Sequence, residues 1–253
     1  LALVVREDDE RLGALGPVLE KEIPGLTGAV VLENRTRATV ARGELTRVLC
    51  GRPHFRERLD DLVFDLHALS FFQTNTQAAE RLIRTVRAIV RPLPGDRLLD
   101  LYCGAGTFAL ALAGRFRRVL GIDQVAPAID DARRNALANG LTGVEFLAGD
   151  VEEWIREQEG DFDGVVVDPP RAGLHPRALS RLPGLQPRWI LYVSCNPATL
   201  ARDAAGLRQS GYVPESLQIV DLFPHTAHVE SVLLFRRGDE PPFFSGNPLP
   251  PDA

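Results

Sequence analysis

Two side chains near the end of the chain are of types that carry out covalent chemistry together. Cys195 follows an apolar run, residues 189–193, and precedes Asn196-Pro197, a typical helix start. Glu230 lies in a short polar break before another apolar run. A helix N-terminus lowers the pKa of a thiol and favours the nucleophilic thiolate, and a carboxylate accepts protons. Although a lone Cys is most often a small buried hydrophobe, this position predicts Cys195 as a nucleophile and Glu230 as a base.

Residues 100–109 have the form of a nucleotide-binding turn between a strand and a helix. Gly104 and Gly106 allow a ligand to approach the backbone, and the helix start offers free N–H groups. Asp123 ends the next predicted strand, where a carboxylate accepts hydrogen bonds from ribose hydroxyls. Asp150 ends the third strand, where it either reaches the adenine end of a nucleoside or caps the following helix. NAD-dependent dehydrogenases and S-adenosylmethionine (SAM) enzymes share this pattern.

A rigid acidic loop, Asp168-Pro169-Pro170-Arg171, ends the fourth predicted strand. Ligands bind at this edge of open α/β sheets, and a stiff loop there suits a planar base. A strand-ending turn is the alternative interpretation. Two histidines, His225 and His228, have ligand-like spacing, but no HExxH frame or further acid supports them. No metal is therefore expected.

The elements that must position these residues alternate from residue 97 onward. Strands are predicted at 97–101, 118–123, 144–148, 164–168 and 189–194, with helices after Thr107 and at 127–139, 151–158, 176–182 and 197–209. Two further strands, 216–222 and 229–235, have no full helix between them. The pattern predicts a doubly wound, mostly parallel, seven-stranded Rossmann-like α/β sheet with an antiparallel terminal hairpin.

The residues before this sheet are expected to form a small N-terminal α/β subdomain, 1–70. Strands are predicted at 1–5 and 28–32, a helix at 10–23, a hairpin from 37–40 and 45–49, and another strand around Leu62, Phe64 and Leu66. A helix follows Asn75 as its cap, with Arg84, Arg87 and Arg91 on one face. A solvated face is the preferred interpretation of these arginines, and contact with RNA phosphates is the alternative. The catalytic domain then spans 71–237, and 238–253 is expected to be a Pro-rich flexible tail.

Composition sets the remaining bounds. The chain has 253 residues, 45% hydrophobic, with a net charge of −5 and no apolar run long enough to cross a membrane. Its three cysteines form no CxxC pair, which favours a reducing cytoplasm over a disulfide framework. The sequence contains no methionine, so residue 1 is not expected to be the native start, and a preceding module is an open alternative. No membrane and no obligate protein partner are implied.

Together these residues resemble the RNA (uracil-5-)-methyltransferases, the family that makes 5-methyluridine in ribosomal and transfer RNA. The resemblance runs in order through residues 71–75 (Phe-Phe-Gln-Thr-Asn), 100–108, 168–171, 194–197 and 223–230. It covers most of the chain. It is strongest to the bacterial 23S ribosomal RNA branch, whose members have a run similar to residues 192–203.

The resemblance implies a role for each matching residue. Cys195 would add to C6 of uracil, and Glu230 would remove the C5 proton. Phe72 is a candidate apolar wall for the base, with core packing as the alternative, and Asp168 and Arg171 are suited to holding either the base or the amine of the cofactor, with Arg171 assigned to the base. SAM would be bound by a set of loop and strand-end residues, Gln73, Tyr102, Gly104, Thr107, Asp123, Asp150 and Asp168.

The chain departs from the family pattern in three places. The family often has Glu at the position of Asp123 and Asn or another polar residue at that of Thr107, and both changes keep the expected hydrogen bonds. Many members carry an N-terminal oligonucleotide-binding barrel, and some bind an iron–sulfur cluster. No cluster is expected in this chain, because Cys50 is isolated in the sequence, and residues 1–70 resemble only the family's central RNA-contacting piece rather than the barrel. The resemblance thus predicts a cytoplasmic, SAM-dependent enzyme forming 5-methyluridine in 23S rRNA, with a tRNA methyltransferase or an NAD-dependent oxidoreductase as alternatives.

Overall fold

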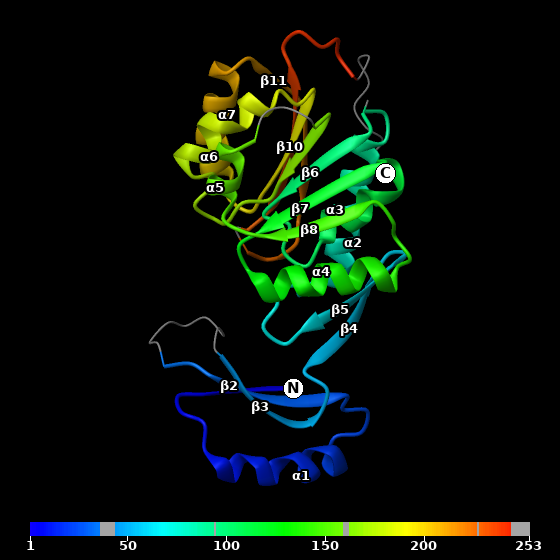
Figure 1. Ribbon diagram of the computed structural model, residues 1–253, viewed down its shortest axis with the longest axis vertical. Helices are drawn as coiled ribbons and strands as arrows, with labels where there is room; N and C mark the ends of the chain where they lie inside the picture. The colour runs from blue at the N-terminus through cyan, green and yellow to red at the C-terminus, as the bar shows by residue number, and fades with distance from the viewer. Residues whose placement is uncertain (36–43, 94, 159–161, 227, 244–253) are drawn as a thin grey trace.

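The computed structural model describes residues 1–35, 44–93, 95–158, 162–226 and 228–243. In this part of the chain the strands form a three-stranded N-terminal sheet, a two-stranded hairpin and a seven-stranded large sheet. Figure 1 shows the N-terminal sheet and the large sheet at opposite ends of the long axis, with the hairpin between them. No described helix is long and apolar enough to cross a membrane.

The large sheet has the strand order β11-β12-β10-β9-β6-β7-β8. Its strands are β6 (Arg97–Leu101), β7 (Arg118–Asp123), β8 (Val144–Ala148), β9 (Gly164–Val167), β10 (Trp189–Ser194), β11 (Tyr212–Val220) and β12 (Glu230–Arg237). Strand β12 is antiparallel to both β10 and β11, and the other pairs are parallel. The predicted doubly wound sheet with an antiparallel terminal hairpin is therefore confirmed. Strand β11 begins four residues before its predicted start, directly after the turn at Gly211.

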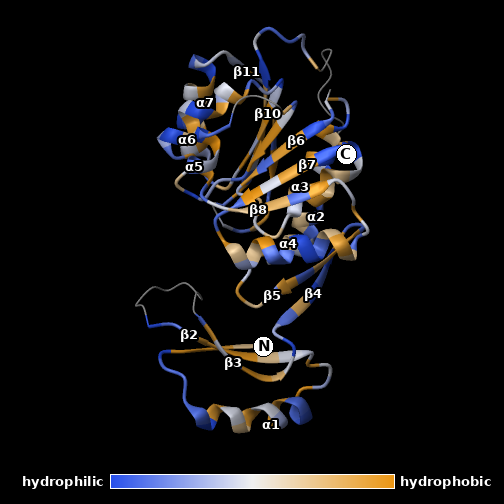
Figure 2. Cartoon of the chain, in the orientation of Figure 1, coloured by the Kyte–Doolittle hydropathy of each residue, from blue (hydrophilic) through white to orange (hydrophobic). Residues whose placement is uncertain are grey.

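Helices cover both faces of the large sheet, which is why its central strands are buried on both sides. One face carries α2 (Thr76–Val90), α3 (Thr107–Leu112) and α4 (Ala126–Ala138), and the other carries α5 (Val151–Arg156), α6 (Pro176–Arg181) and α7 (Pro197–Gln209) (Figure 1). Two short 3₁₀ segments, η2 (Ala113–Arg115) and η3 (Leu182–Leu185), follow α3 and α6. The two faces hold separate hydrophobic clusters. In Figure 2 the strands of the large sheet are mostly hydrophobic, whereas the helices carry hydrophilic segments.

The N-terminal sheet combines β1 (Ala2–Val5), β2 (Gly28–Glu33) and β3 (Glu44–Gly51), with β1 parallel and β3 antiparallel to β2. The helix predicted at 10–23 divides into a 3₁₀ segment, η1 (Glu10–Ala14), and α1 (Leu15–Glu22). The predicted strand at 37–40 lies outside the described residues. Its expected partner, β3, pairs with β2.

The hairpin consists of β4 (His54–Leu59) and β5 (Leu62–His67), and it packs against α4 and α2. The alternating residues of β5 are buried as predicted, Leu62, Phe64 and Leu66. Strand β4 is missing from the predicted elements, because the charged run 56–58 breaks the alternation of apolar and polar residues.

Side chains of α4 take the place of a neighbouring strand beside β5. Backbone N–H groups at alternate β5 residues donate to oxygens spaced four residues apart on the helix, Val63 to Asn139 (2.9 Å), Asp65 to Asn135 (2.7 Å) and His67 to Asp131 (2.8 Å). Two residues along a strand and four along a helix both span about 6 Å. The free edge of β5 is thus covered, which removes a site for unwanted strand pairing.

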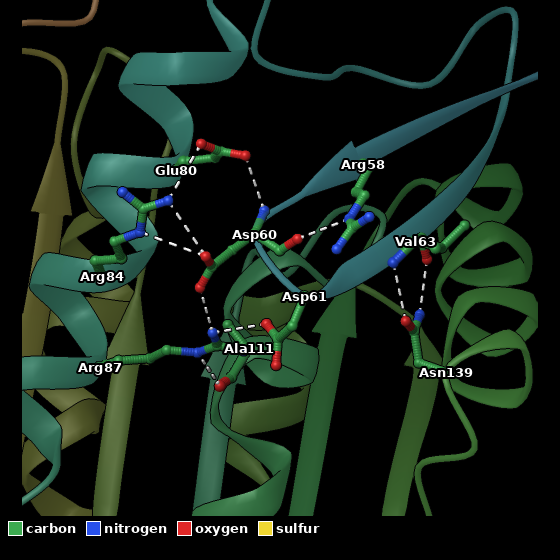
Figure 3. A network of polar contacts seen from close by, with 9 residues as sticks. All are labelled: Arg58, Asp60, Asp61, Val63, Glu80, Arg84, Arg87, Ala111 and Asn139. Atoms are coloured by element: carbon green, nitrogen blue, oxygen red, sulfur yellow. Dashed lines mark hydrogen bonds and ion pairs between the residues drawn. The ribbon is translucent and has the colours of Figure 1, made fainter.

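Ion pairs join α2 to the hairpin turn (Figure 3). The Arg87 guanidinium lies 2.8 Å from Asp60 and 2.7 Å from Asp61, and Arg84 lies 3.2 Å from Asp60 and 3.3 Å from Glu80. Arg84 is exposed, in line with the interpretation of these arginines as a solvated face, whereas Arg87 is half-buried. Both also form ion pairs that link α2 to the hairpin turn.

Candidate active site

The strand register brings Cys195 and Glu230 together. Strand β10 pairs with β12 up to Ser194 opposite Ser231, so Cys195 and Glu230 are the chain neighbours of this last pair, and the charge of Glu230 acts on the Cys195 thiol. Directly opposite residues of antiparallel strands have their Cβ atoms about 5 Å apart. Glu230 is buried and Cys195 is half-buried. The two predicted catalytic side chains thus lie side by side, although 35 positions separate 195 from 230 in the sequence.

The thiol has a different electrostatic environment from the predicted one. Cys195 directly precedes Asn196, whose side chain caps α7 by accepting from the N–H of Ala198 at 3.1 Å. Burial nevertheless raises the pKa of Cys195, and the nearby carboxyl groups of Glu230 and Asp168 raise it further, against the opposing charge of Arg171. In the chain without bound ligands the thiol pKa is therefore raised, and the predicted lowering is wrong. Burial is the larger cause, and the charges of Glu230 and Asp168 add to it.

Carboxyl groups converge at the same edge of the sheet. Burial raises the pKa of Glu230 to about 7. The pKa of Asp168 lies well above its usual range because of burial and then the charges of Glu230, Asp100 and Asp123. Burial and Asp123 also raise the pKa of Asp100 to about 8, although the N–H of Ala109 donates to it at 2.8 Å. Such a cluster favours a bound cation, because a positive charge stabilises the ionised carboxylates.

Asp100 is the site residue that the sequence-based assignment missed. Its side chain is fully buried, and its Oδ1 atom has no hydrogen-bond partner among the described residues. The signal was a single acid inside the apolar run Leu98–Leu101, directly before the glycine loop. A buried charge in that context needs a partner.

The glycine loop connects β6 to α3 and is held by Asp123. The N–H of Gly104 donates to Asp123 at 2.9 Å, and the N–H of Val125 donates to the other carboxylate oxygen at 2.8 Å. Gly104 and Gly106 have left-handed φ values of 53° and 88°, which only glycine adopts without strain. A Cβ on Gly104 would meet no protein atom within 4 Å. The loop thus leaves open space over its backbone.

The other predicted cofactor residues have different local roles. Asp150 caps α5 by accepting from the N–H of Glu153 at 3.0 Å, as the alternative interpretation stated. The Tyr102 hydroxyl lies 3.3 Å from Glu152, and burial raises the pKa of Tyr102. Gln73 and Thr107 are half-buried. The start of α2, just after Gln73, is tied to the segment before β12, because the Asn75 amide donates to Leu222 at 3.0 Å.

The predicted substrate residues lie in two different environments. The ring of Phe72 packs against Phe64 with centroids 5.4 Å apart, whereas Phe71 is 78% exposed. Arg171 is exposed, and its guanidinium contacts His228 Nδ1 at 3.2 Å. The described residues contain no group of three His, Cys, Asp or Glu side chains that could hold a metal ion.

The topology and the site define the class of protein. A seven-stranded sheet with an antiparallel last strand, and a glycine loop with strand-end acids at its carboxyl edge, is the fold of the SAM-dependent methyltransferases. Comparison with known families goes further. The chain belongs to the tRNA (uracil-5-)-methyltransferase family, whose model matches residues 32–238.

Individual relatives agree with this assignment. The chain is 41% identical over 212 residues to an uncharacterized RNA methyltransferase of Caldanaerobacter subterraneus, covering 84% of this chain and 47% of the relative. It is 42% identical over 235 residues to an uncharacterized RNA methyltransferase of Chlorobaculum tepidum, covering 91% of this chain and 47% of the relative. Among solved structures, the Pyrococcus abyssi tRNA (uracil-54, C5)-methyltransferase in complex with S-adenosyl-L-homocysteine has a TM-score of 0.77 at 37% identity, covering 92% of this chain and 55% of that one. The chain thus spans about half the length of the curated relatives it matches.

The residues present fit SAM, which carries a positively charged sulfonium and an ammonium group. The unpartnered Asp100 oxygen and the raised carboxyl pKa values at this edge favour a cationic ligand. The open space over Gly104 allows a ligand to lie against the backbone.

Proposed function

We propose that this chain methylates C5 of a uridine in RNA through a covalent bond between the Cys195 sulfur and C6 of the base. The observation that supports this most directly is the proximity of Cys195 and Glu230, which are the chain neighbours of the paired Ser194 and Ser231 and interact electrostatically. A nucleophile and a base on one side of a cofactor site meet the requirements of this reaction. The NAD-dependent alternative leaves both residues without a role.

Uracil C5 is too weak a nucleophile to take a methyl group unaided. Addition of the Cys195 sulfur to C6 makes C5 an enolate carbon. When bound, SAM supplies the electrophilic methyl group for C5. Glu230 then accepts the C5 proton, and the C6–sulfur bond breaks, which returns the thiolate and leaves 5-methyluridine. Arg171 holds the base, and its charge favours the thiolate.

For the cofactor, we propose contacts from the glycine loop at Tyr102, Gly104 and Thr107, from the strand ends at Asp123, Asp150 and Asp168, and from Gln73. Asp123 already holds the loop through Gly104. Asp100 would add a buried negative charge to this set.

The RNA substrate is proposed to be ribosomal, with 23S rRNA as the first candidate and the cytoplasm as the location. The P. abyssi neighbour acts on tRNA, so tRNA is the second candidate. Residues 1–70 are proposed to contact the RNA outside the flipped uridine, which must leave its stack to reach the sulfur. Incubating the purified protein with SAM and transcripts of each RNA, followed by mapping of 5-methyluridine, decides between them.

The covalent step is tested with RNA containing 5-fluorouridine, because fluorine at C5 cannot be removed as a proton and the adduct persists. Wild type should form a gel-stable adduct in the presence of SAM, and Cys195→Ala should form none while still binding SAM. Cys50→Ala is the matched control, since Cys50 lies in β3 of the N-terminal sheet. An adduct in Cys195→Ala, or its absence in wild type, would reject the proposal.

A second variant tests the base. Glu230→Gln should accumulate the methylated adduct on ordinary uridine RNA, because the C5 proton has no acceptor. Turnover at the wild-type rate in this variant would reject Glu230 as the base.

A further inference from the structure

Helix α7, whose N-cap Asn196 directly follows Cys195, makes several side-chain contacts with the loop that carries Asp168 and Arg171. The carbonyl oxygen of Arg171 lies 3.2 Å from the Asn196 amide nitrogen and 3.3 Å from the Thr199 hydroxyl. Pro169 and Pro170 have no N–H to donate, so this loop segment cannot form a regular backbone ladder. Its position therefore depends on side chains from the helix.

Two further residues of α7 continue the same set of contacts. Arg202 donates to the carbonyls of Ala172 at 2.9 Å and Leu174 at 3.3 Å, and Asp203 accepts from the N–H of Leu174 at 2.8 Å. A Cβ on Gly173 would lie 2.5 Å from both the Arg202 and Asp203 side chains. The loop thus approaches the helix as closely as glycine permits.

Asp203 also connects the loop to the strand that carries the nucleophile. Its side chain is fully buried, and the Tyr192 hydroxyl of β10 donates to it at 2.7 Å. Burial raises the pKa of Tyr192, so the hydroxyl stays protonated as a donor. Tyr192 lies on β10, three residues before Cys195, which directly follows the strand. One carboxylate therefore joins β10, α7 and the acidic loop.

We infer that Thr199, Asp203 and Tyr192 are positioning residues, which fix the Asp168–Arg171 loop relative to the Cys195 sulfur and thereby set the rate of covalent attack on the base. This inference rests on the proposed function. The physical reason is that a base held by the loop reacts fast only when its C6 atom is kept near the sulfur, and small displacements cost large factors in rate. None of these side chains is assigned a contact with the base or cofactor.

The first test compares two buried tyrosines with the same chemistry. Tyr192→Phe removes the hydrogen bond to Asp203, whereas Tyr212→Phe removes a hydrogen bond to Pro187 of 2.9 Å that does not involve the loop. Both side chains are buried. With saturating SAM and 5-fluorouridine RNA, Tyr192→Phe should slow adduct formation about tenfold, and Tyr212→Phe should leave it within about twofold of wild type. SAM affinity should change little in either variant.

The second test uses the Thr199 hydroxyl. Thr199→Val keeps the shape and removes the hydroxyl, so adduct formation should slow about fivefold to tenfold, and Thr199→Ser should restore it. Wild-type adduct rates in both Thr199→Val and Tyr192→Phe would overturn the inference. Equal slowing by Tyr212→Phe would also overturn it, because the effect would then be general destabilisation.

A measurement independent of the chemistry separates this inference from the proposed function. Amide hydrogen exchange of the peptide containing residues 171–174 should be faster in Tyr192→Phe and Thr199→Val than in wild type or Tyr212→Phe. Unchanged exchange in both variants would overturn the inference whatever the adduct result. If wild type forms no adduct but exchange increases as expected, the proposed function fails and the loop-holding contacts stand.

Discussion

The side-chain oxygen of Asn135 accepts a hydrogen bond of 2.7 Å from the backbone N–H of Asp65. The same side chain donates from its amide nitrogen to the carbonyl of Ala105 at 3.2 Å, and it is fully buried. One residue of α4 therefore touches both the hairpin and the glycine loop. Because its two hydrogen bonds use opposite ends of the amide, the two contacts can be separated by mutation.

Asn135→Asp should weaken SAM binding, since it keeps the acceptor for Asp65 and removes the donor to Ala105. We expect a loss of about fivefold to tenfold, the cost of one buried hydrogen bond. Asn139→Asp is the matched control, because Asn139 pairs with Val63 of the hairpin through both ends of its amide and has no contact with the loop. Both variants should lose stability, but SAM titration by calorimetry should separate them. Equal SAM affinity in the two variants would show that the loop contact has no effect on the cofactor site.

The contacts of α4 mark a limit of prediction from sequence. The helix itself and its end before Gly140 follow from periodicity and from the glycine. That Asn135 and Asn139 replace a strand beside β5 does not follow, because this requires knowing which segment packs on the helix. Helix-end propensity explains Asn139 equally well without any such role.

The site was predictable where position along a strand decides it. Asp123, Asp168 and Cys195 each end or follow an apolar strand, and parallel strand ends must meet at one edge. The pKa direction of Cys195 could not be predicted, because it depends on the burial of the thiol and then on which carboxylates lie near it in the fold. Asp100 was missed for a related reason. In the sequence, an acid inside an apolar run looks like an interruption of the strand until the structure shows that its side chain is buried.

SAM binding should release protons at neutral pH. Burial raises the pKa of Asp100 to about 8 and that of Glu230 to about 7, so both carry protons in part of the molecules at pH 7. A bound cation favours the ionised forms, so affinity for SAM should rise with pH between 6 and 8, with release of about one proton. Calorimetry in two buffers of different ionisation enthalpy measures this release.

S-adenosylhomocysteine is the matched ligand for this measurement, because it lacks the sulfonium charge and should release fewer protons. Asp100→Asn should reduce the release with SAM. Identical binding enthalpies in the two buffers would contradict the expected linkage.

Glu230→Gln should change how stability depends on pH. Because burial raises the pKa of Glu230 from 4.5 to about 7, the folded chain holds a proton that the unfolded chain has released between these values. Wild-type stability should therefore fall as pH rises from about 5 to 7, by on the order of 2 kcal/mol from this residue. The neutral glutamine avoids this loss, so the variant should be the more stable of the two at pH 8. Urea unfolding at pH 5 and pH 8 measures the difference, with Glu22→Gln, at an exposed position, as the control.

Three glycines with left-handed backbones should respond differently to alanine. Gly104, Gly106 and Gly140 have φ values of 53°, 88° and 64°, so each substitution costs about 1 kcal/mol of backbone strain. A Cβ on Gly106 would also lie 3.0 Å from the ring of Phe146, whereas Gly104 and Gly140 have no protein atom within 4 Å of the added carbon. Gly106→Ala should therefore be the most destabilising, by about 2–3 kcal/mol.

The three variants should rank differently by SAM affinity than by stability. Gly104→Ala should fold with a stability close to that of Gly140→Ala but lose at least about tenfold in SAM affinity, because its methyl group enters the space over the loop. Gly140→Ala should bind SAM normally, since Gly140 lies after the end of α4, outside the glycine loop, and its added Cβ meets no protein atom within 4 Å. Thermal unfolding measures the stability of each variant, and SAM titration on the same preparations measures its affinity for SAM. Normal SAM affinity in Gly104→Ala would mean that the cofactor does not lie over this glycine, and the assignment of the loop would have to be abandoned.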